Sequence, residues 1–165
     1  AWGYTGGPKP YGYLGLGEVF VFVFFGLVAT VGTTFVAIEK ITGLSVLGGA
    51  IAGCLACALL VINNLRDRPA DERVGKRTLA VRLGDDATRW FYSGLLAAAF
   101  VLVLVAAIAR PPVLIAVVAA PLALAPVRTV RGGADGQRLI AVLGETGRLQ
   151  LVTGALVAIG LALGG

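Results

Sequence analysis

The chain has 165 residues, of which 58% are hydrophobic and 14% charged, and its formal net charge is +5. So large an apolar fraction excludes an ordinary water-soluble domain of this size. The absence of histidine from the sequence excludes His-based catalytic triads and histidine metal sites. We therefore interpret residues 1–165 as a single polytopic membrane domain of the all-α class, a bundle of transmembrane helices.

Residues 1–18 predict a surface loop, because Gly and Pro break regular structure and Tyr favours a membrane interface. Five apolar runs follow, and each predicts a membrane-spanning helix. The runs cover residues 19–38, 44–62, 90–109, 113–127 and 149–163. Pro121 and Pro126 interrupt the fourth run, and residues 128–148 predict a polar loop.

Small side chains in the second run indicate close helix packing. Cys54 and Cys57 form a CxxC pair, which in a soluble protein suggests a redox or zinc site. The sequence has no second pair and the surrounding residues are apolar, so we interpret both cysteines as packing residues. Gly48, Gly49 and Gly53 are also packing positions rather than a phosphate-binding loop, since no strand precedes them.

The second run leads into a charged island, residues 63–89. Asn63, Asp67 and Asp71 are four residues apart, so a continuous helix would place them on one stripe. Two carboxylates at this spacing repel each other by roughly 0.2–0.5 kcal/mol. A divalent cation would offset that repulsion, and Mg²⁺ takes hard oxygen ligands together with substrate phosphates. The spacing therefore predicts a magnesium site at these three residues.

Pro69 lies between the two aspartates and predicts either a kink near Arg68 or a new helix that begins at Pro69. A new helix would direct its N-terminus, which favours anions, at the site. Three nearby cations, Arg66, Lys76 and Arg77, are suited to hold the remaining phosphate charge. The spacing alone leaves open a solvated loop between two membrane helices.

A longer string surrounds these residues. It reads Asn-Asn-Leu-Arg-Asp at residues 63–67, then Asp71, then Gly-Lys-Arg-Thr-Leu-Ala-Val-Arg-Leu-Gly at residues 75–84. The string resembles the second aspartate-rich motif of the UbiA superfamily of intramembrane prenyltransferases. It is most similar to the members that act on 1,4-dihydroxy-2-naphthoate in menaquinone synthesis. Residues 4–18, Tyr-Thr-Gly-Gly-Pro-Lys-Pro-Tyr-Gly-Tyr-Leu-Gly-Leu-Gly-Glu, resemble the loop that helps to cover the active site of the same enzymes.

The resemblance implies Mg²⁺-dependent transfer of a polyprenyl group from polyprenyl diphosphate to an aromatic acid, with loss of CO₂. It also implies an apolar tunnel, open to the lipid bilayer, for the isoprenoid tail. Asp67 and Asp71 would be the catalytic residues. The full implied set is the metal ligands Asn63, Asp67 and Asp71, the diphosphate ligands Arg66, Lys76 and Arg77, and the acceptor-loop residues Lys9 and Tyr11.

The sequence departs from the family pattern in one respect. The family has about nine helices and two aspartate-rich motifs, whereas this chain has five predicted spans and only the second motif. Half of the expected metal site is therefore absent from the sequence. We predict that these residues are a C-terminal portion that is inactive alone and that an N-terminal half is its partner.

Two other functions stay open. Within the superfamily, the acceptor would be 4-hydroxybenzoate, haem or chlorophyllide, although the two strings favour naphthoate. From another class, the chain would be a non-enzymatic transport module, although the interiors of the spans lack the charges that an ion pathway needs. Nucleic acid is not an expected partner, because the aspartates of the island would repel its phosphates.

The distribution of Lys and Arg predicts an orientation. The island carries seven of them and the following polar loop four, whereas Lys40 and Arg110 stand alone on the alternate side. The positive-inside rule thus places the island and the N-terminal loop on the cytoplasmic side of a bacterial cell membrane, with the C-terminus outside. Trp90 and Tyr92 predict that the third helix begins at a membrane interface.

Overall fold

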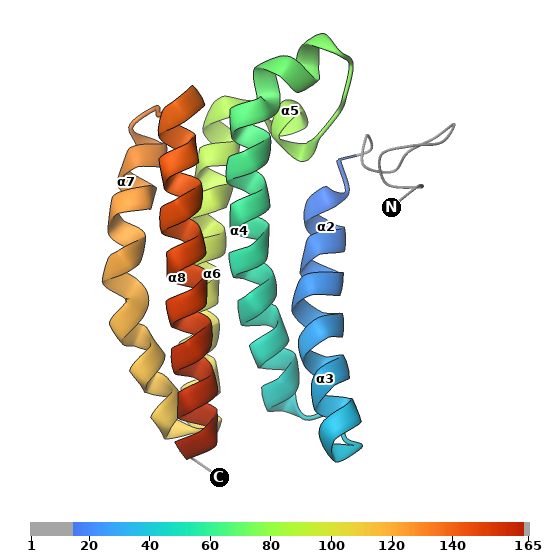
Figure 1. Cartoon of the computed structure of the whole chain (residues 1–165), viewed down its shortest axis with the longest axis vertical. Coiled ribbons are helices and arrows are strands. Elements are labelled where there is room, and N and C mark those ends of the chain that lie inside the picture. Colours follow the sequence, from blue (N-terminus) through green and yellow to red (C-terminus); the bar gives the residue numbers. More distant parts are fainter. Residues whose placement is uncertain (1–14, 164–165) are drawn as a thin grey trace.

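A computed structural model describes residues 15–163, and every regular element within them is a helix. Five long helical rods run up and down in succession (Figure 1). The first rod joins α2 (Gly17–Val21), the π-helical η2 (Phe22–Val28) and α3 (Ala29–Ile38). The others are α4 (Gly43–Arg73), α6 (Asp85–Ala109), the 3₁₀ helix η3 (Pro111–Ala123) with α7 (Leu124–Arg131), and α8 (Gly136–Leu163), and the short α5 (Leu79–Leu83) follows α4. Within the described residues five rods are long and apolar enough to cross a membrane, which confirms the predicted all-α bundle.

Two helices extend further than the hydropathy pattern predicts. α4 continues past Ile62 to Arg73, so the first part of the charged island is helical. α8 begins at Gly136, so the predicted polar loop over residues 128–148 is wrong, and the turn between α7 and α8 is confined to residues 132–135. The reason is that hydropathy reports only the membrane-buried part of a helix. Leu, Arg, Gln and Glu are good helix formers and continue it beyond the apolar run.

The helix passes through Pro69, so of the two alternatives predicted there the new helix is wrong. Pro69 removes one backbone donor, which is tolerable so close to the end of α4. The Val74 N–H still donates to the Ala70 carbonyl at 3.3 Å. The uninterrupted helix keeps Asn63, Asp67 and Asp71 at the four-residue spacing of the sequence, and each is turned by about 40° around the helix axis from the one before it.

α4 is the central element and packs against η2, α6 and α8. Glycines allow the first rod to approach it closely. A Cβ atom added at Gly26 would lie 2.5 Å from the Gly53 Cα, and one added at Gly53 would lie 2.7 Å from Phe22 Cδ2. Gly53 is thus confirmed as a packing position. Cys54 and Cys57 are buried free thiols, as predicted.

The start of α6 corrects one prediction. Trp90 is 64% exposed, in keeping with an interface, and the Arg131 guanidinium lies 3.2 Å from its ring centroid. Tyr92 does not face an interface: its side chain is fully buried, and its hydroxyl lies 2.8 Å from Thr146 Oγ1 on α8. Two positions along a helix turn a side chain to a different face, so an aromatic cluster need not lie wholly at the membrane surface.

The rods alternate in direction, so their connections collect at two ends of the bundle (Figure 1). We call the end with residues 63–89 and the turn 132–135 the charged end. The far end holds the turn 39–42, Arg110 and the last turn of α8. The two groups of basic residues therefore share one end, as the charge distribution predicts, and the cytoplasmic orientation of that end stays a prediction.

Candidate functional site

The last turn of α4 brings Lys76 onto Asp71. The Lys76 N–H donates to the Asp71 carbonyl at 2.9 Å and the Gly75 N–H to the Glu72 carbonyl at 3.2 Å, a pair of bonds that commonly ends a helix. Gly75 has a φ of 72°, which a side chain would disfavour. The resulting turn places Lys76 Nζ 3.1 and 3.2 Å from the two carboxylate oxygens of Asp71, which is only 8% exposed.

One turn earlier, Asp67 has its own cation. Arg66 Nε and Nη2 donate to the two carboxylate oxygens of Asp67 at 2.8 and 2.9 Å. Arg66 Nη2 also donates to Asn63 Oδ1 at 2.8 Å. The structure therefore brings Asn63, Arg66 and Asp67 together as one cluster and Asp71 with Lys76 as another.

These two clusters change how the aspartate pair is explained. Each carboxylate is neutralised by a cation of the chain itself, so the repulsion between them does not by itself require a metal ion. Arg66 and Lys76, which the sequence suggests for a diphosphate, contact the acids instead. An incoming metal or phosphate would exchange with these contacts.

A polar cavity of about 580 Å³ lies between the end of α4 and α5. Among residues 15–163, its cationic lining consists of Lys76, Arg77 and Arg82, and Glu72 is the single acid that lines it. Three cations around one cavity form a site for a polyanion. Lys76 and Arg77 are among the predicted diphosphate ligands, whereas Arg82 was not predicted, although it belongs to the same family-like string at residues 75–84.

Local structure fixes Arg82 at this cavity. Thr78 caps α5, since its hydroxyl accepts a hydrogen bond from the Val81 N–H at 3.4 Å. Arg82 Nε donates to the Arg77 carbonyl at 3.3 Å. A Cβ atom at Gly15 would lie 2.9 Å from Arg82 Nε and 3.1 Å from the Arg77 carbonyl oxygen. Gly15 therefore lies at the wall of the cavity, whereas the predicted loop residues Lys9 and Tyr11 lie outside the described residues.

A hydrogen-bonded chain ties the helices together at the charged end. Arg89 pairs with Asp85 and donates from Nη1 to the carbonyls of Val130 at 2.6 Å and Ala134 at 2.9 Å. Asp85 also accepts from Arg68 Nη2 at 3.4 Å. The contacts link α4, α6 and the end of α7, so the turn of α4 that carries Asp67 is held against its neighbours.

A second polar contact joins the first rod to α4. Glu18 is 5% exposed, and its Oε1 accepts a hydrogen bond from Asn64 Nδ2 at 2.9 Å. The Cys57 thiol donates to the Glu18 carbonyl at 3.0 Å. Glu18 was not among the predicted site residues, although an acid directly before an apolar run is a signal that identifies such residues.

The predicted metal ligands have suitable chemistry but form only part of a site. Among residues 15–163, no group of three His, Cys, Asp or Glu side chains comes together. Asn63, Asp67 and Asp71 offer an amide oxygen and two carboxylates, which are hard oxygen donors. Mg²⁺ is commonly bound by one or two carboxylates plus substrate phosphates, so the donors present fit that ion.

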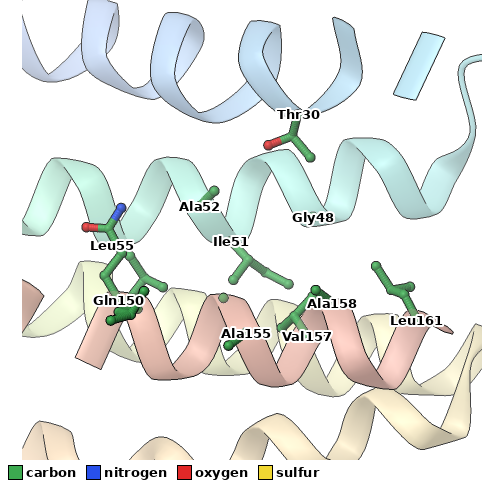
Figure 2. Close-up of a pocket in the computed structure, with 12 residues that line it drawn as sticks. Thr30, Gly48, Ile51, Ala52, Leu55, Gln150, Ala155, Val157, Ala158 and Leu161 are labelled. Atoms are coloured by element: carbon green, nitrogen blue, oxygen red, sulfur yellow. The ribbon is translucent and has the colours of Figure 1, made fainter. Parts of the chain in front are cut away.

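An apolar pocket of about 510 Å³ opens along α4 further into the bundle (Figure 2). Its lining comes from α3, α4 and α8, with Thr30 and Gln150 as the polar members. Leu55 marks its near end on α4, twelve residues before Asp67, or about 18 Å at the helical rise. The same helix thus carries the acids at one end and an apolar pocket deeper in the bundle.

Comparison with known proteins gives a consistent result. Residues 1–140 match the model of the UbiA prenyltransferase family. The chain is 51% identical to a 1,4-dihydroxy-2-naphthoate octaprenyltransferase of Mycobacterium tuberculosis, over 99% of this chain and 56% of that protein. Proteins of the same name in Mycobacterium leprae and Haemophilus influenzae are 46% and 37% identical, over 100% and 98% of this chain and 56% and 53% of their own lengths. The chain thus spans about half the length of the curated relatives it matches, and no solved structure matches it.

Proposed function

The chain belongs to the UbiA prenyltransferase family, and on that premise we propose that the whole protein transfers a polyprenyl group from polyprenyl diphosphate to 1,4-dihydroxy-2-naphthoate. The proposed product is the hydroquinone form of a demethylmenaquinone, produced with loss of CO₂. The observation that carries the proposal is the cationic cavity beside Asp71, in a chain similar along its whole length to proteins named for this reaction. The assignment of residues 1–165 to one domain is part of the proposal.

The cavity would bind the diphosphate of the donor. Lys76, Arg77 and Arg82 supply positive charge where the leaving group gathers negative charge. Asn63, Asp67 and Asp71 would hold Mg²⁺, which when bound supplies further charge to stabilise the leaving diphosphate. Polar side chains and acids at one end of α4 would therefore fix the reactive end of the donor.

The apolar pocket along α4 would take part of the isoprenoid tail. Its lining lies deeper in the bundle than Asp67 and is shared by α3, α4 and α8. A tail anchored there leaves the allylic carbon near the charged end. Positioning of this kind lowers the entropy cost of the reaction.

In the proposed transfer the bond between the allylic carbon and the diphosphate oxygen breaks. The ring carbon that carries the carboxylate forms a new bond to the allylic carbon. The bond from that ring carbon to the carboxylate then breaks, CO₂ leaves, and its bonding electron pair restores the aromatic ring. The cations of the cavity would stabilise the diphosphate that departs, and the surrounding helices would limit access of water to the allylic carbon.

The protein is a multi-pass membrane protein, and we place it in a bacterial cell membrane with the charged end on the cytoplasmic side. The expected partners are polyprenyl diphosphate, the aromatic acid and the bilayer. That the 165 residues alone make no product stays a prediction, which addition of this chain by itself to both substrates tests.

The test is Mg²⁺-dependent prenylation of 1,4-dihydroxy-2-naphthoate in membranes that contain the full-length protein. The wild type is compared with a variant carrying Asp67→Asn and Asp71→Asn. A lipid-soluble product from the wild type and none from the variant supports the reaction and the role of the acids. Equal product from both would remove these aspartates from the mechanism, and product from other aromatic acids only would replace the proposed acceptor.

A further inference from the structure

Glu18 is a buried carboxylate at the charged end that the mechanism above does not use. Its Oε1 accepts the hydrogen bond from Asn64, whereas its Oε2, equally buried, has no hydrogen-bond partner within residues 15–163. A buried acceptor without a partner is costly, and in native proteins such an atom usually meets a ligand, an ion or an ordered water. The unpaired Oε2 of Glu18 therefore indicates a further contact.

The position of Glu18 narrows the identity of that contact. Asn64 and Asp71 are seven residues apart on α4 and share one face, so Glu18 lies about 10 Å deeper than Asp71 along the helix axis. Glu18 also follows Gly15, which lies against Arg82 at the cationic cavity, by three residues. The carboxylate thus lies about two helical turns from Asp71, on the side of the membrane interior.

The chemistry of the two substrates further limits which group can contact Glu18 Oε2. An ionised carboxylate accepts hydrogen bonds and repels anions. The diphosphate of the donor is an anion without a donor group under neutral conditions, and its tail is a hydrocarbon. The carboxylate of the aromatic acceptor is also an anion. The ring hydroxyls of the acceptor are the remaining hydrogen-bond donors.

We propose that Glu18 is an acceptor-binding residue, whose Oε2 accepts a hydrogen bond from a ring hydroxyl of the aromatic substrate while Asn64 holds the carboxylate in place. This inference rests on the proposed function. The contact orients the ring toward the allylic carbon. It also raises the electron density of the ring, which is the nucleophile of the reaction.

The proposal makes Glu18 a determinant of specificity. A buried group that is built to bind a substrate hydroxyl discriminates strongly against an analogue that lacks it, because the group is then left unpaired. Loss of the contact should therefore affect only those acceptors that carry the hydroxyl in question. A merely structural role would affect all acceptors alike.

The experiment uses the full-length protein in membranes and the variant Glu18→Gln, which keeps the size of the side chain. The matched control is Glu145→Gln, the same change at an exposed position near the charged end. Turnover is measured with 1,4-dihydroxy-2-naphthoate. Inhibition constants are measured for 1-hydroxy-2-naphthoate and 4-hydroxy-2-naphthoate, each of which lacks one hydroxyl.

We expect Glu18→Gln to raise the KM for the dihydroxy acceptor about tenfold, with an unchanged KM for the donor. It should weaken one monohydroxy inhibitor by the same factor and leave the other unchanged. Equal weakening of all three compounds would overturn the inference, as would no weakening at all, the result expected if an ordered water alone occupies the site. Absence of product from the wild type would instead overturn the proposed function, and the inference with it.

Discussion

The two ends of the bundle are built in different ways. At the charged end, ion pairs and left-handed glycine turns fix Lys76 on Asp71 and Arg89 on the end of α7. At the far end, helices meet by close backbone contact, as where a Cβ at Gly160 would lie 2.5 Å from the Val113 Cα. Partly exposed ion pairs contribute about 0–1 kcal/mol each to stability. In a tightly packed contact, by contrast, a single added methyl group disturbs the packing and destabilises the fold. The contrast assigns chemistry to one end and stability to the other.

The largest effect should follow from Asp71→Asn at the charged end. We expect a loss of at least about 100-fold in prenyl transfer, because the change removes a proposed metal ligand and leaves Lys76 without its carboxylate. The control is Asp135→Asn, the same change at an exposed position in the turn before α8. The measurement is turnover per folded protein in membranes. Equal losses in the two variants would show that the charged end acts only through its total charge.

The second effect should follow from Arg82→Gln. Arg82 lines the cationic cavity and forms no ion pair with a carboxylate of residues 15–163, so its charge is available to a ligand. We expect the KM for polyprenyl diphosphate to rise about 30-fold, which is the change that corresponds to the loss of one charge-assisted hydrogen bond.

Arg138→Gln is the control for this variant, since Arg138 is an exposed cation near the same end. The readout is the KM for the donor against the KM for the acceptor at saturating Mg²⁺. A rise in both constants, or an equal rise in the control, would mean that Arg82 is a general surface charge and not a ligand of the diphosphate.

The sequence was enough to predict the elements that depend on local composition. Apolar run length predicts the five spans. Glycine at position 53 predicts close packing. Each of these signals arises within one helix, where side-chain order and geometry are directly related.

The remaining features depend on contacts between distant residues. The role of Arg89 requires the carbonyls of Val130 and Ala134, which are more than forty positions away and carry no side-chain signal. The Glu18–Asn64 pair likewise joins two helices. Hydropathy also placed the start of α8 too late, because a helix continues into water without a change in its hydrogen bonding.

The third effect concerns stability at the far end. Gly160→Ala should lower the free energy of unfolding by about 1 kcal/mol, because the added methyl group meets the backbone of Pro112 and Val113. Gly147→Ala is the matched change on the same helix, where a Cβ meets nothing within 4 Å. Both variants gain the same helix propensity, so their difference isolates the contact. Unfolding in mixed micelles measures it, and identical midpoints would contradict the packing role.

The smallest effect should come from a buried polar contact between α6 and α8. Tyr92→Phe removes the hydroxyl that lies 2.8 Å from Thr146 Oγ1, but Thr146 keeps its own bond to the Val142 carbonyl at 2.7 Å. We therefore expect a loss of only about 0.6 kcal/mol, the average for interhelical hydrogen bonds in membranes. Thr146→Val leaves the buried Tyr92 hydroxyl unpaired and should cost more, about 1–3 kcal/mol. A double-mutant cycle in the same micelles separates the interaction between the two hydroxyls from the cost of leaving one of them unpaired. If Tyr92→Phe lowered the free energy of unfolding more than Gly160→Ala, polar contacts would stabilise the bundle as strongly as close packing. The contrast between a chemical end and a stabilising end would then be wrong.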